Sequence, residues 1–316
     1  MKIALLIGIN YYNTDNKLNG CINDINDIKK MLINLMDFKE KDIFIMNDYH
    51  GIKPTKNNIM EQLQNFIIKS NDASECWFHY SGHGCKIADK SGDENDGYDE
   101  VICPIDSIND NSNFICDDEL YNMIKNINKK AKCIFIMDCC HSGTNLDLLN
   151  SVTYKNENEV YYHKNIGKNE LKNHNIIMIS GCLDYQTSAD AFNINNNYKY
   201  NGALTSTLLN IINKNKKISY GRMIITLHKE LKIKKFTQIP MMSFSKKINL
   251  EESFLACIDN INNNDNNDNN DNINNNDDFK KNEKIYNIEN KINQIISKLS
   301  DVNNDIDDIT KIIKNI

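Results

Sequence analysis

Arginine is almost absent from this sequence. Arg222 is the only arginine among 37 lysine and arginine residues, while asparagine, isoleucine and lysine are abundant along all 316 residues. Such a bias is typical of a genome rich in A and T. Asparagine-rich tracts are therefore poor indicators of function in this chain.

Long apolar runs are also missing. No run approaches the roughly 20 residues that a membrane-spanning helix needs, so we expect no membrane partner. The apolar start of the chain lacks the small-residue cleavage site of a signal peptide, and we interpret it as a buried strand. The ten cysteines are scattered, mostly inside apolar runs, which favours free thiols and a reducing, cytoplasmic location. A net charge of −6 argues against nucleic acid as the main partner.

Two apolar runs end abruptly in reactive side chains. Residues 132–138 stop at an acid, two thiols and a glycine turn, and residues 75–80 stop near His83, which lies between two glycines. Both runs read as buried strands of a parallel sheet, whose carboxyl ends display ligand-binding groups. A thiol needs a neighbouring base to become a thiolate near neutral pH. His83 and Cys140 are therefore the candidate catalytic pair.

Each of these residues also has a simpler interpretation. A single cysteine is most often a small buried hydrophobe, and a single histidine a satisfied polar group. Two strand-end sites in one chain favour the functional interpretation for His83 and Cys140. For His79 and Cys133, which lie within their strands, we expect a structural role. Spacing alone does not separate Cys139 from Cys140.

At these residues the chain resembles the caspase-like clan of cysteine proteases, and within it the metacaspases. Residues 79–84, His-Tyr-Ser-Gly-His-Gly, and 138–143, Asp-Cys-Cys-His-Ser-Gly, resemble two motifs of that family. The candidate histidine and cysteine are 57 positions apart (140 − 83), near the separation of roughly 50 that is typical of caspases. The resemblance covers about residues 1–257, and the further matching segments are 18–24, 180–182, 186–190 and 202–205.

The resemblance implies roles for several residues. It makes the second cysteine, Cys140, the nucleophile of a cysteine endopeptidase, and it assigns the walls of the substrate pocket to Cys21, Asp24, Ser81 and Asp138. A buried carboxylate pair favours a cationic guest, so we expect protein or peptide substrates with Arg or Lys at the cleaved bond. Animal caspases bind Asp in basic pockets, for which a chain with one arginine is poorly equipped. The backbone N–H groups of Gly84 and Cys140 are candidates for the oxyanion site.

Alternating strand and helix patterns predict an α/β fold with a doubly wound, mostly parallel sheet flanked by helices. The caspase-like family has that architecture. The predicted strands are 2–9, 43–46, 75–80, 132–138, 175–179 and 236–244, and the predicted helices are 20–36, 55–69, 117–127, 202–212 and 220–231.

Two acidic clusters lie between the candidate histidine and cysteine. The loop 89–100 is acidic, and a second cluster, 117–119, opens a predicted helix. A solvated turn and a helix N-terminus explain them without any ligand. Calcium, however, prefers several carboxylate oxygens on a flexible frame, and the resemblance implies calcium activation. Carried over by motif, the ligands are Asp99, Asp117, Asp118 and Asp147.

The segment 155–173 is polar, and its plain interpretation is a surface connection. Because similar enzymes cut themselves after basic residues in this region, Lys155, Lys164 and Lys168 are candidate autoprocessing sites. Residues 238–243 depart from the family's usual stretch, which affects the expected fine specificity and not the chemistry.

The C-terminal segment 258–316 differs in composition from the rest. Residues 1–257 are the predicted catalytic domain, and 258–278, almost entirely Asn and Asp, form a predicted disordered linker. Within 279–316, apolar residues recur three and four apart over 285–316, which predicts a coiled-coil helix. Isoleucine at both core positions favours a homotrimer or homotetramer. Abundant isoleucine, or a helix folded back onto the catalytic domain, is the simpler alternative.

The function expected from the sequence is therefore a cysteine endopeptidase, similar to the catalytic domain of type I metacaspases. A Pro-rich or zinc-finger extension before the first strand is lacking, so we expect no recruitment through an amino-terminal prodomain. The alternative is a catalytically silent caspase-like scaffold that oligomerises through its coiled coil. An intact His83, Cys140 and pair of pocket acids argue against the scaffold.

Overall fold

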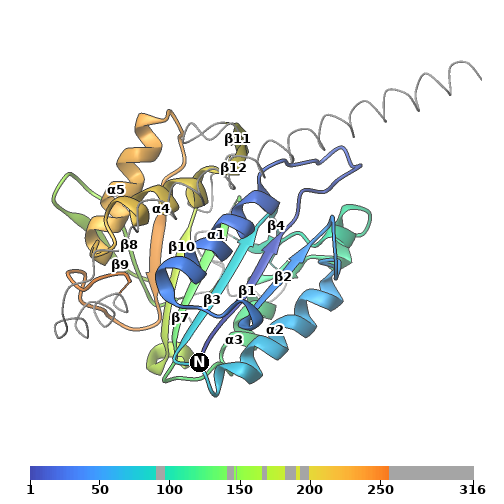
Figure 1. Ribbon diagram of the computed structural model, residues 1–316, viewed down its shortest axis with the longest axis horizontal. Coiled ribbons are helices and arrows are strands. Elements are labelled where there is room, and N and C mark those ends of the chain that lie inside the picture. The colour runs from blue at the N-terminus through green and yellow to red at the C-terminus, as the bar shows by residue number, and fades with distance from the viewer. Residues whose placement is uncertain are drawn as a thin grey trace, which may run out of the picture. The chain divides into compact units, whose positions relative to one another are not determined.

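The apolar run at the start of the chain forms the strand β1 (Lys2–Gly8), the second strand from one edge of a large sheet (Figure 1). The computed structural model describes residues 1–89, 97–140, 146, 148–165, 169–181, 190–192 and 199–255. In this part of the chain, eight strands form one sheet in the order β2-β1-β3-β7-β10-β13-β8-β9. The other seven are β2 (Ile43–Asn47), β3 (Glu75–Ser81), β7 (Lys132–Asp138), β10 (Asn175–Ser180), β13 (Met241–Phe244), β8 (Asn150–Tyr154) and β9 (Val160–Lys164).

The sheet is mixed and mostly parallel. Strands β2, β1, β3, β7 and β10 pair in parallel, whereas β13, β8 and β9 are each antiparallel to the strand before them in the sheet. The predicted α/β class and the parallel half are confirmed. The predicted last strand 236–244 is shorter, because only Met241–Phe244 pairs. The predicted surface connection 155–173 is mostly exposed at its start, but Val160–Lys164 within it forms the strand β9, which pairs with β8.

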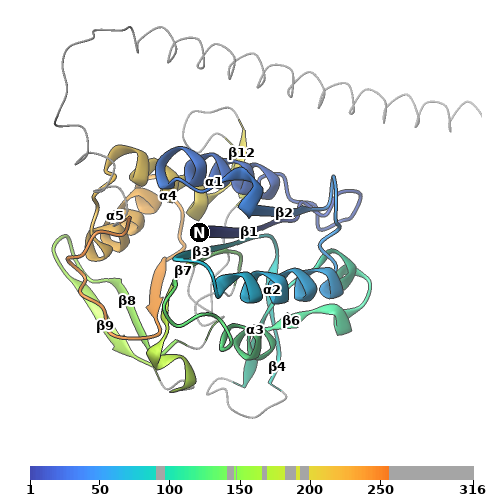
Figure 2. The ribbon, with the colours of Figure 1, turned by 60° about the horizontal axis from the view of Figure 1, so that its bottom comes forward.

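Helices cover both faces of this sheet (Figure 2). One face carries α1 (Cys21–Met36), α4 (Ala203–Lys214) and α5 (Tyr220–Ile233), and the other carries α2 (Lys56–Ser70) and α3 (Asp117–Ile124). Alternate residues of β1 feed the two layers: Leu5 packs towards α2, and Leu6 packs towards α1. The parallel strands thus contribute apolar side chains to both layers, which explains their long hydrophobic runs.

The helices follow local sequence signals. The helix α1 buries Ile25, Ile28 and Leu32 at three- and four-residue spacing, as predicted. Thr55 caps α2 by accepting a hydrogen bond from the Asn58 backbone N–H. The helix α3 ends at Ile124, before the predicted residue 127, because the chain there turns through short-range backbone hydrogen bonds.

A small antiparallel sheet interrupts the alternation after β3. It consists of β4 (Gly84–Ala88), β5 (Tyr98–Ile102) and β6 (Ile115–Cys116), and the sequence analysis does not predict it. Strand β4 begins directly after His83, and Cys103, after β5, donates its backbone N–H to the His83 carbonyl. This sheet therefore borders the candidate site.

Some predictions fall outside the described residues. The Asn/Asp-rich linker, the coiled-coil helix, Asp147 and Lys168 lie there. No helix among the described residues is long and apolar enough to cross a membrane.

The structural roles predicted for His79 and Cys133 agree with their burial. Both side chains are completely buried in the central strands β3 and β7. The His79 Nε2 lies 3.4 Å from the Thr205 hydroxyl of α4, and Nδ1 has no hydrogen-bond partner. Because burial disfavours the charged ring, it lowers the pKa of His79 from its ordinary value of 6.5 to about 3.

This burial predicts a pH dependence of stability. Between pH 6.5 and about 3 only the unfolded chain protonates His79, so the stabilisation is complete above pH 6.5 and is lost as the pH falls. From pH 7 to pH 5, the wild type should lose about 2 kcal/mol more unfolding free energy than His79→Gln. Urea unfolding of both proteins at the two pH values measures the difference. An equal loss of unfolding free energy in both proteins between pH 7 and pH 5 would contradict the lowered pKa of His79.

Candidate active site

The register of two neighbouring strands brings the candidate histidine and cysteine to one edge of the sheet. Strands β3 and β7 pair in parallel, with Ser81 opposite Asp138 at their carboxyl ends. His83 and Cys140 each lie two residues beyond that last pair. Cys139 is buried, with 1% of its surface exposed, whereas Cys140 is partly exposed. Exposure therefore favours Cys140 as the reactive thiol.

The imidazole of His83 is oriented by a backbone carbonyl. Its Nε2 lies 2.6 Å from the carbonyl oxygen of Asn16, in the loop between β1 and α1. A carbonyl oxygen only accepts, so Nε2 carries the proton and a neutral ring keeps Nδ1 free to act as a base. The Tyr11 ring packs against the imidazole, with centroids 4.6 Å apart.

Two buried tyrosine hydroxyls hold the backbone of His83. The His83 N–H donates to the Tyr11 hydroxyl over 2.9 Å, and the Tyr80 hydroxyl donates to the His83 carbonyl over 2.8 Å. Burial raises the pKa of both tyrosines well above 10.0, so both hydroxyls stay neutral. Sequence reasoning missed Tyr11, for which no motif offered a signal.

Gly84 brings its backbone against the cysteine turn. A Cβ at this position would lie 2.3 Å from the Cys140 carbonyl oxygen and 3.3 Å from the Cys139 sulfur. Only glycine permits that approach without a shift. The close contact is compatible with the predicted oxyanion role of the Gly84 and Cys140 N–H groups.

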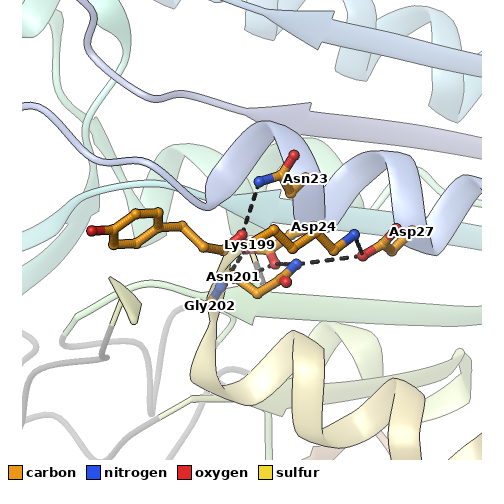
Figure 3. Close-up of polar contacts among 7 residues, drawn as sticks. Asn23, Asp24, Asp27, Lys199, Asn201 and Gly202 are labelled. Carbon is orange, nitrogen blue, oxygen red and sulfur yellow. Dashed lines mark hydrogen bonds and ion pairs between the residues drawn. The ribbon is translucent and has the colours of Figure 1, made fainter. Parts of the chain in front are cut away.

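The predicted pocket acids are both buried and lie near one another. Asp24, with 0% of its surface exposed, accepts a hydrogen bond from the Ser81 hydroxyl (2.7 Å). It also accepts hydrogen bonds from the Asn201 amide (3.0 Å) and the Gly202 N–H (3.0 Å) (Figure 3). Asp138, 5% exposed, accepts from the backbone N–H (2.9 Å) and hydroxyl (2.8 Å) of a threonine in the first turn of α4, Thr205.

Gly202 separates these two carboxylates. A Cβ on it would lie 2.2 Å from an Asp138 oxygen and 2.8 Å from an Asp24 oxygen. Burial, and then the charge of Asp138, raise the pKa of Asp24 well above 3.8. The arrangement therefore favours a cation nearby. Cys21 is also buried, one helical turn before Asp24 on α1.

Polar side chains of α1 also hold the strand β12 (Tyr200–Gly202) (Figure 3). Asn23 donates to the Tyr200 carbonyl over 2.8 Å, and Lys199 forms an ion pair with Asp27. Sequence reasoning flagged residues 202–205 as a matching segment but assigned no role to Thr205 or to Asn201.

The predicted calcium ligands are only partly described. Asp99 on β5 and Asp117 at the start of α3 are both buried, and Asp117 accepts the N–H groups of Glu100 and Asp118. Within the described ranges, no group of three or more His, Cys, Asp or Glu side chains is arranged to hold a metal ion. The fourth predicted ligand, Asp147, and the acidic residues 90–96 lie outside those ranges.

The candidate autoprocessing lysines are exposed where they are described. Lys155 follows β8 and Lys164 ends β9, both on the surface of the hairpin.

Comparison with known proteins identifies the family of this chain. Residues 2–149 match the family model described as "Metacaspase, peptidase C14 domain". The chain is 33% identical to Metacaspase-3 of Trypanosoma brucei brucei over 268 residues, 79% of this chain and 73% of that protein. It is 30% identical to Metacaspase-1B of Neurospora crassa over 297 residues, 80% of this chain and 68% of that protein. The chain belongs to the metacaspases, a family of cysteine peptidases.

The fold has a solved counterpart of lower similarity. The crystal structure of protein GSU0716 from Geobacter sulfurreducens superimposes with a TM-score of 0.53 at 20% identity, covering 81% of this chain and 98% of that one. At this identity the likeness concerns the fold alone.

The Gly84 contact leads to a test. Gly84→Ala should lower kcat/KM on peptide substrates at least about 10-fold and destabilise the fold by about 1–3 kcal/mol, because the new Cβ must displace the Cys140 backbone. Gly221→Ala in α5 is the matched control, since its Cβ would make an ordinary 3.4 Å contact. If Gly84→Ala kept the kcat/KM of the wild type, the tight packing of Gly84 against the Cys140 backbone would be refuted.

Proposed function

We propose that this metacaspase is an endopeptidase that cleaves after Arg or Lys, with Cys140 as nucleophile and His83 as base. The observation that supports the proposal is the β3–β7 register, which ends at Ser81 opposite Asp138, two residues before His83 and Cys140. The Ser81 hydroxyl also donates to the buried Asp24 of α1. A thiol, a base and an anionic pocket are the parts that this reaction requires.

The chemistry begins with proton transfer. His83 takes the Cys140 proton at Nδ1, because Nε2 already donates to the Asn16 carbonyl. The thiolate attacks the peptide carbonyl, and the oxyanion accepts hydrogen bonds from the N–H groups of Gly84 and Cys140. His83 then protonates the leaving amine, and water hydrolyses the acyl-enzyme.

Electrostatics support a cationic substrate side chain. Asp24 and Asp138 are buried close enough for their charges to repel, and this repulsion adds to the effect of burial in raising the pKa of Asp24. An arginine or lysine head group would relieve that repulsion and form charge-assisted hydrogen bonds. Cys21 and Ser81 complete the proposed pocket walls.

Calcium activation is proposed from the family resemblance and the placement of acids. Asp99 lies on β5 and Asp117 directly follows β6, and both are buried. Strand β4 of the same small sheet begins directly after His83. Together with Asp118 and Asp147 they supply the hard oxygen donors that calcium prefers. Bound calcium would neutralise the acids, and the carboxylates would then hold β5 and α3 together.

Association through 285–316 and self-cleavage after Lys155, Lys164 or Lys168 complete the proposal. Oligomerisation would raise the local concentration of neighbouring cleavage sites. The competing function is a catalytically silent scaffold that oligomerises through the same segment, 285–316. Light scattering of the full chain tests association, and a strictly monomeric chain would remove it.

Paired fluorogenic peptides test the chemistry and the specificity. We expect cleavage after Arg and Lys but not after Asp, no cleavage by Cys140→Ala, and activity retained in Cys139→Ala. Asp138→Asn should lower kcat/KM for the Arg peptide by roughly 100-fold, because a buried cation would lose its partner. Preferred cleavage after Asp would refute the pocket, and silence of the wild type under every condition would favour the scaffold.

Calcium requires a readout other than activity. In the Cys140→Ala background, calorimetric titration should show calcium binding that Asp117→Asn and Asp118→Asn weaken at least about 10-fold, since each removes a charged donor. Asp72→Asn, at an exposed carboxylate after α2, is the matched control and should bind as the parent does. Equal affinity of all variants would refute these ligands.

A further inference from the structure

Two cysteines outside the proposed catalytic pair have their sulfurs in contact. Cys85 lies on β4 and Cys103 directly follows β5, and their Sγ atoms are 3.8 Å apart. In the antiparallel pair of β4 and β5, Gly84 lies opposite Ile102, so His83 lies opposite Cys103. Cys85 is two residues after His83 and therefore lies on the same face of the pair. Van der Waals contact between two thiols leaves no atom between them.

The two thiols differ in exposure and in acidity. Cys85 is partly exposed, whereas Cys103 has 6% of its surface exposed. Hydrogen bonding from the Cys103 thiol lowers the pKa of Cys85, while that hydrogen bond and burial raise the pKa of Cys103. An accessible sulfur with thiolate character is the one that oxidants attack, and a neighbouring thiol resolves the product.

We propose that Cys85 and Cys103 are a modification site for hydroperoxides, which convert the two thiols into a disulfide. The Cys85 thiolate attacks the peroxide oxygen; an S–O bond forms, the O–O bond breaks, and the leaving oxygen takes a proton. The Cys103 sulfur then attacks the Cys85 sulfenic acid, an S–S bond forms, and hydroxide leaves with the Cys103 proton as water. The two thiols lose two electrons and two protons to the peroxide.

The disulfide would strain the support of His83. The sulfurs must approach from 3.8 Å to about 2.05 Å, which pulls β4 and the segment after β5 together. The Cys103 N–H donates to the His83 carbonyl, and the Tyr11 hydroxyl bridges the Cys103 carbonyl and the His83 N–H. Gly84 is already packed against the Cys140 backbone, so this segment has little room to move when the disulfide forms. The oxidised enzyme should therefore be less active.

The chain contains its own control pair. Cys76 and Cys133 face each other across β3 and β7 with interacting thiols, but they are only 2% and 0% exposed. If contact between the thiols were sufficient for oxidation, both pairs would form disulfides. If solvent exposure is also required, only Cys85 and Cys103 would do so.

The decisive experiment treats the full-length Cys140→Ala protein with hydrogen peroxide, blocks the remaining thiols and maps linked peptides by mass spectrometry. We expect a link between Cys85 and Cys103 that dithiothreitol reverses, with Cys76 and Cys133 unlinked. Absence of that link, a link from Cys85 to another cysteine, or equal linkage of the control pair would overturn the proposal. This readout needs no peptidase activity, so it stands apart from the proposed function.

Activity tests the consequence, which does rest on the proposed function. Peroxide should inactivate the wild type, and dithiothreitol should restore part of the lost activity. Cys85→Ser and Cys85→Ala should keep basal activity and show a smaller restorable part, which comes from Cys140 sulfenic acid alone. Direct oxidation of Cys140 contributes equally to all three proteins. An identical restorable fraction in wild type and both variants would show that the disulfide leaves catalysis unaffected, and would overturn this consequence.

Discussion

The parallel pairing of β3 with β7 is the constraint on which the rest of this site depends. Its register runs without a break from Glu75 opposite Lys132 to Ser81 opposite Asp138. A slip of one residue would turn every side chain of a strand to the other face and misplace the two turns that follow. The buried apolar core thus maintains the chemistry, because it sets the register that carries His83 and Cys140 to one edge.

Buried polar groups then hold the backbone segments that the core brings together. Hydroxyls of Tyr11 and Tyr80 hold the backbone of His83, and carboxylates of Asp24 and Asp138 hold the segment that carries Gly202. Buried acids are costly unless they are hydrogen-bonded, and here each has several donors. The acids therefore serve both the fold and the proposed pocket. The strands β4 and β5 likewise support His83 and carry the proposed modification site at Cys85 and Cys103.

Agreement between sequence and structure follows the strength of local signals. The strands β1, β3, β7 and β10 and the helices α1 and α2 were predictable, because continuous apolar runs and three- and four-residue spacing leave few alternatives. The hairpin strand β9 was not, since four of its five residues are exposed and no apolar alternation marks it. The sheet of β4, β5 and β6 was missed for a different reason: its strands are short and pair around an acidic loop.

The sequence by itself determined the reactive groups, because a thiol, an imidazole and carboxylates at strand ends are visible as residue types. Only the tertiary structure decided how they are held. The Asn16 carbonyl that orients His83 belongs to a group that every residue possesses, so no side-chain pattern announces it. The contacts of Thr205 with Asp138 and of Cys85 with Cys103 join residues that become neighbours only when the strands pair. Such long-range contacts are set by topology, which local sequence patterns do not encode.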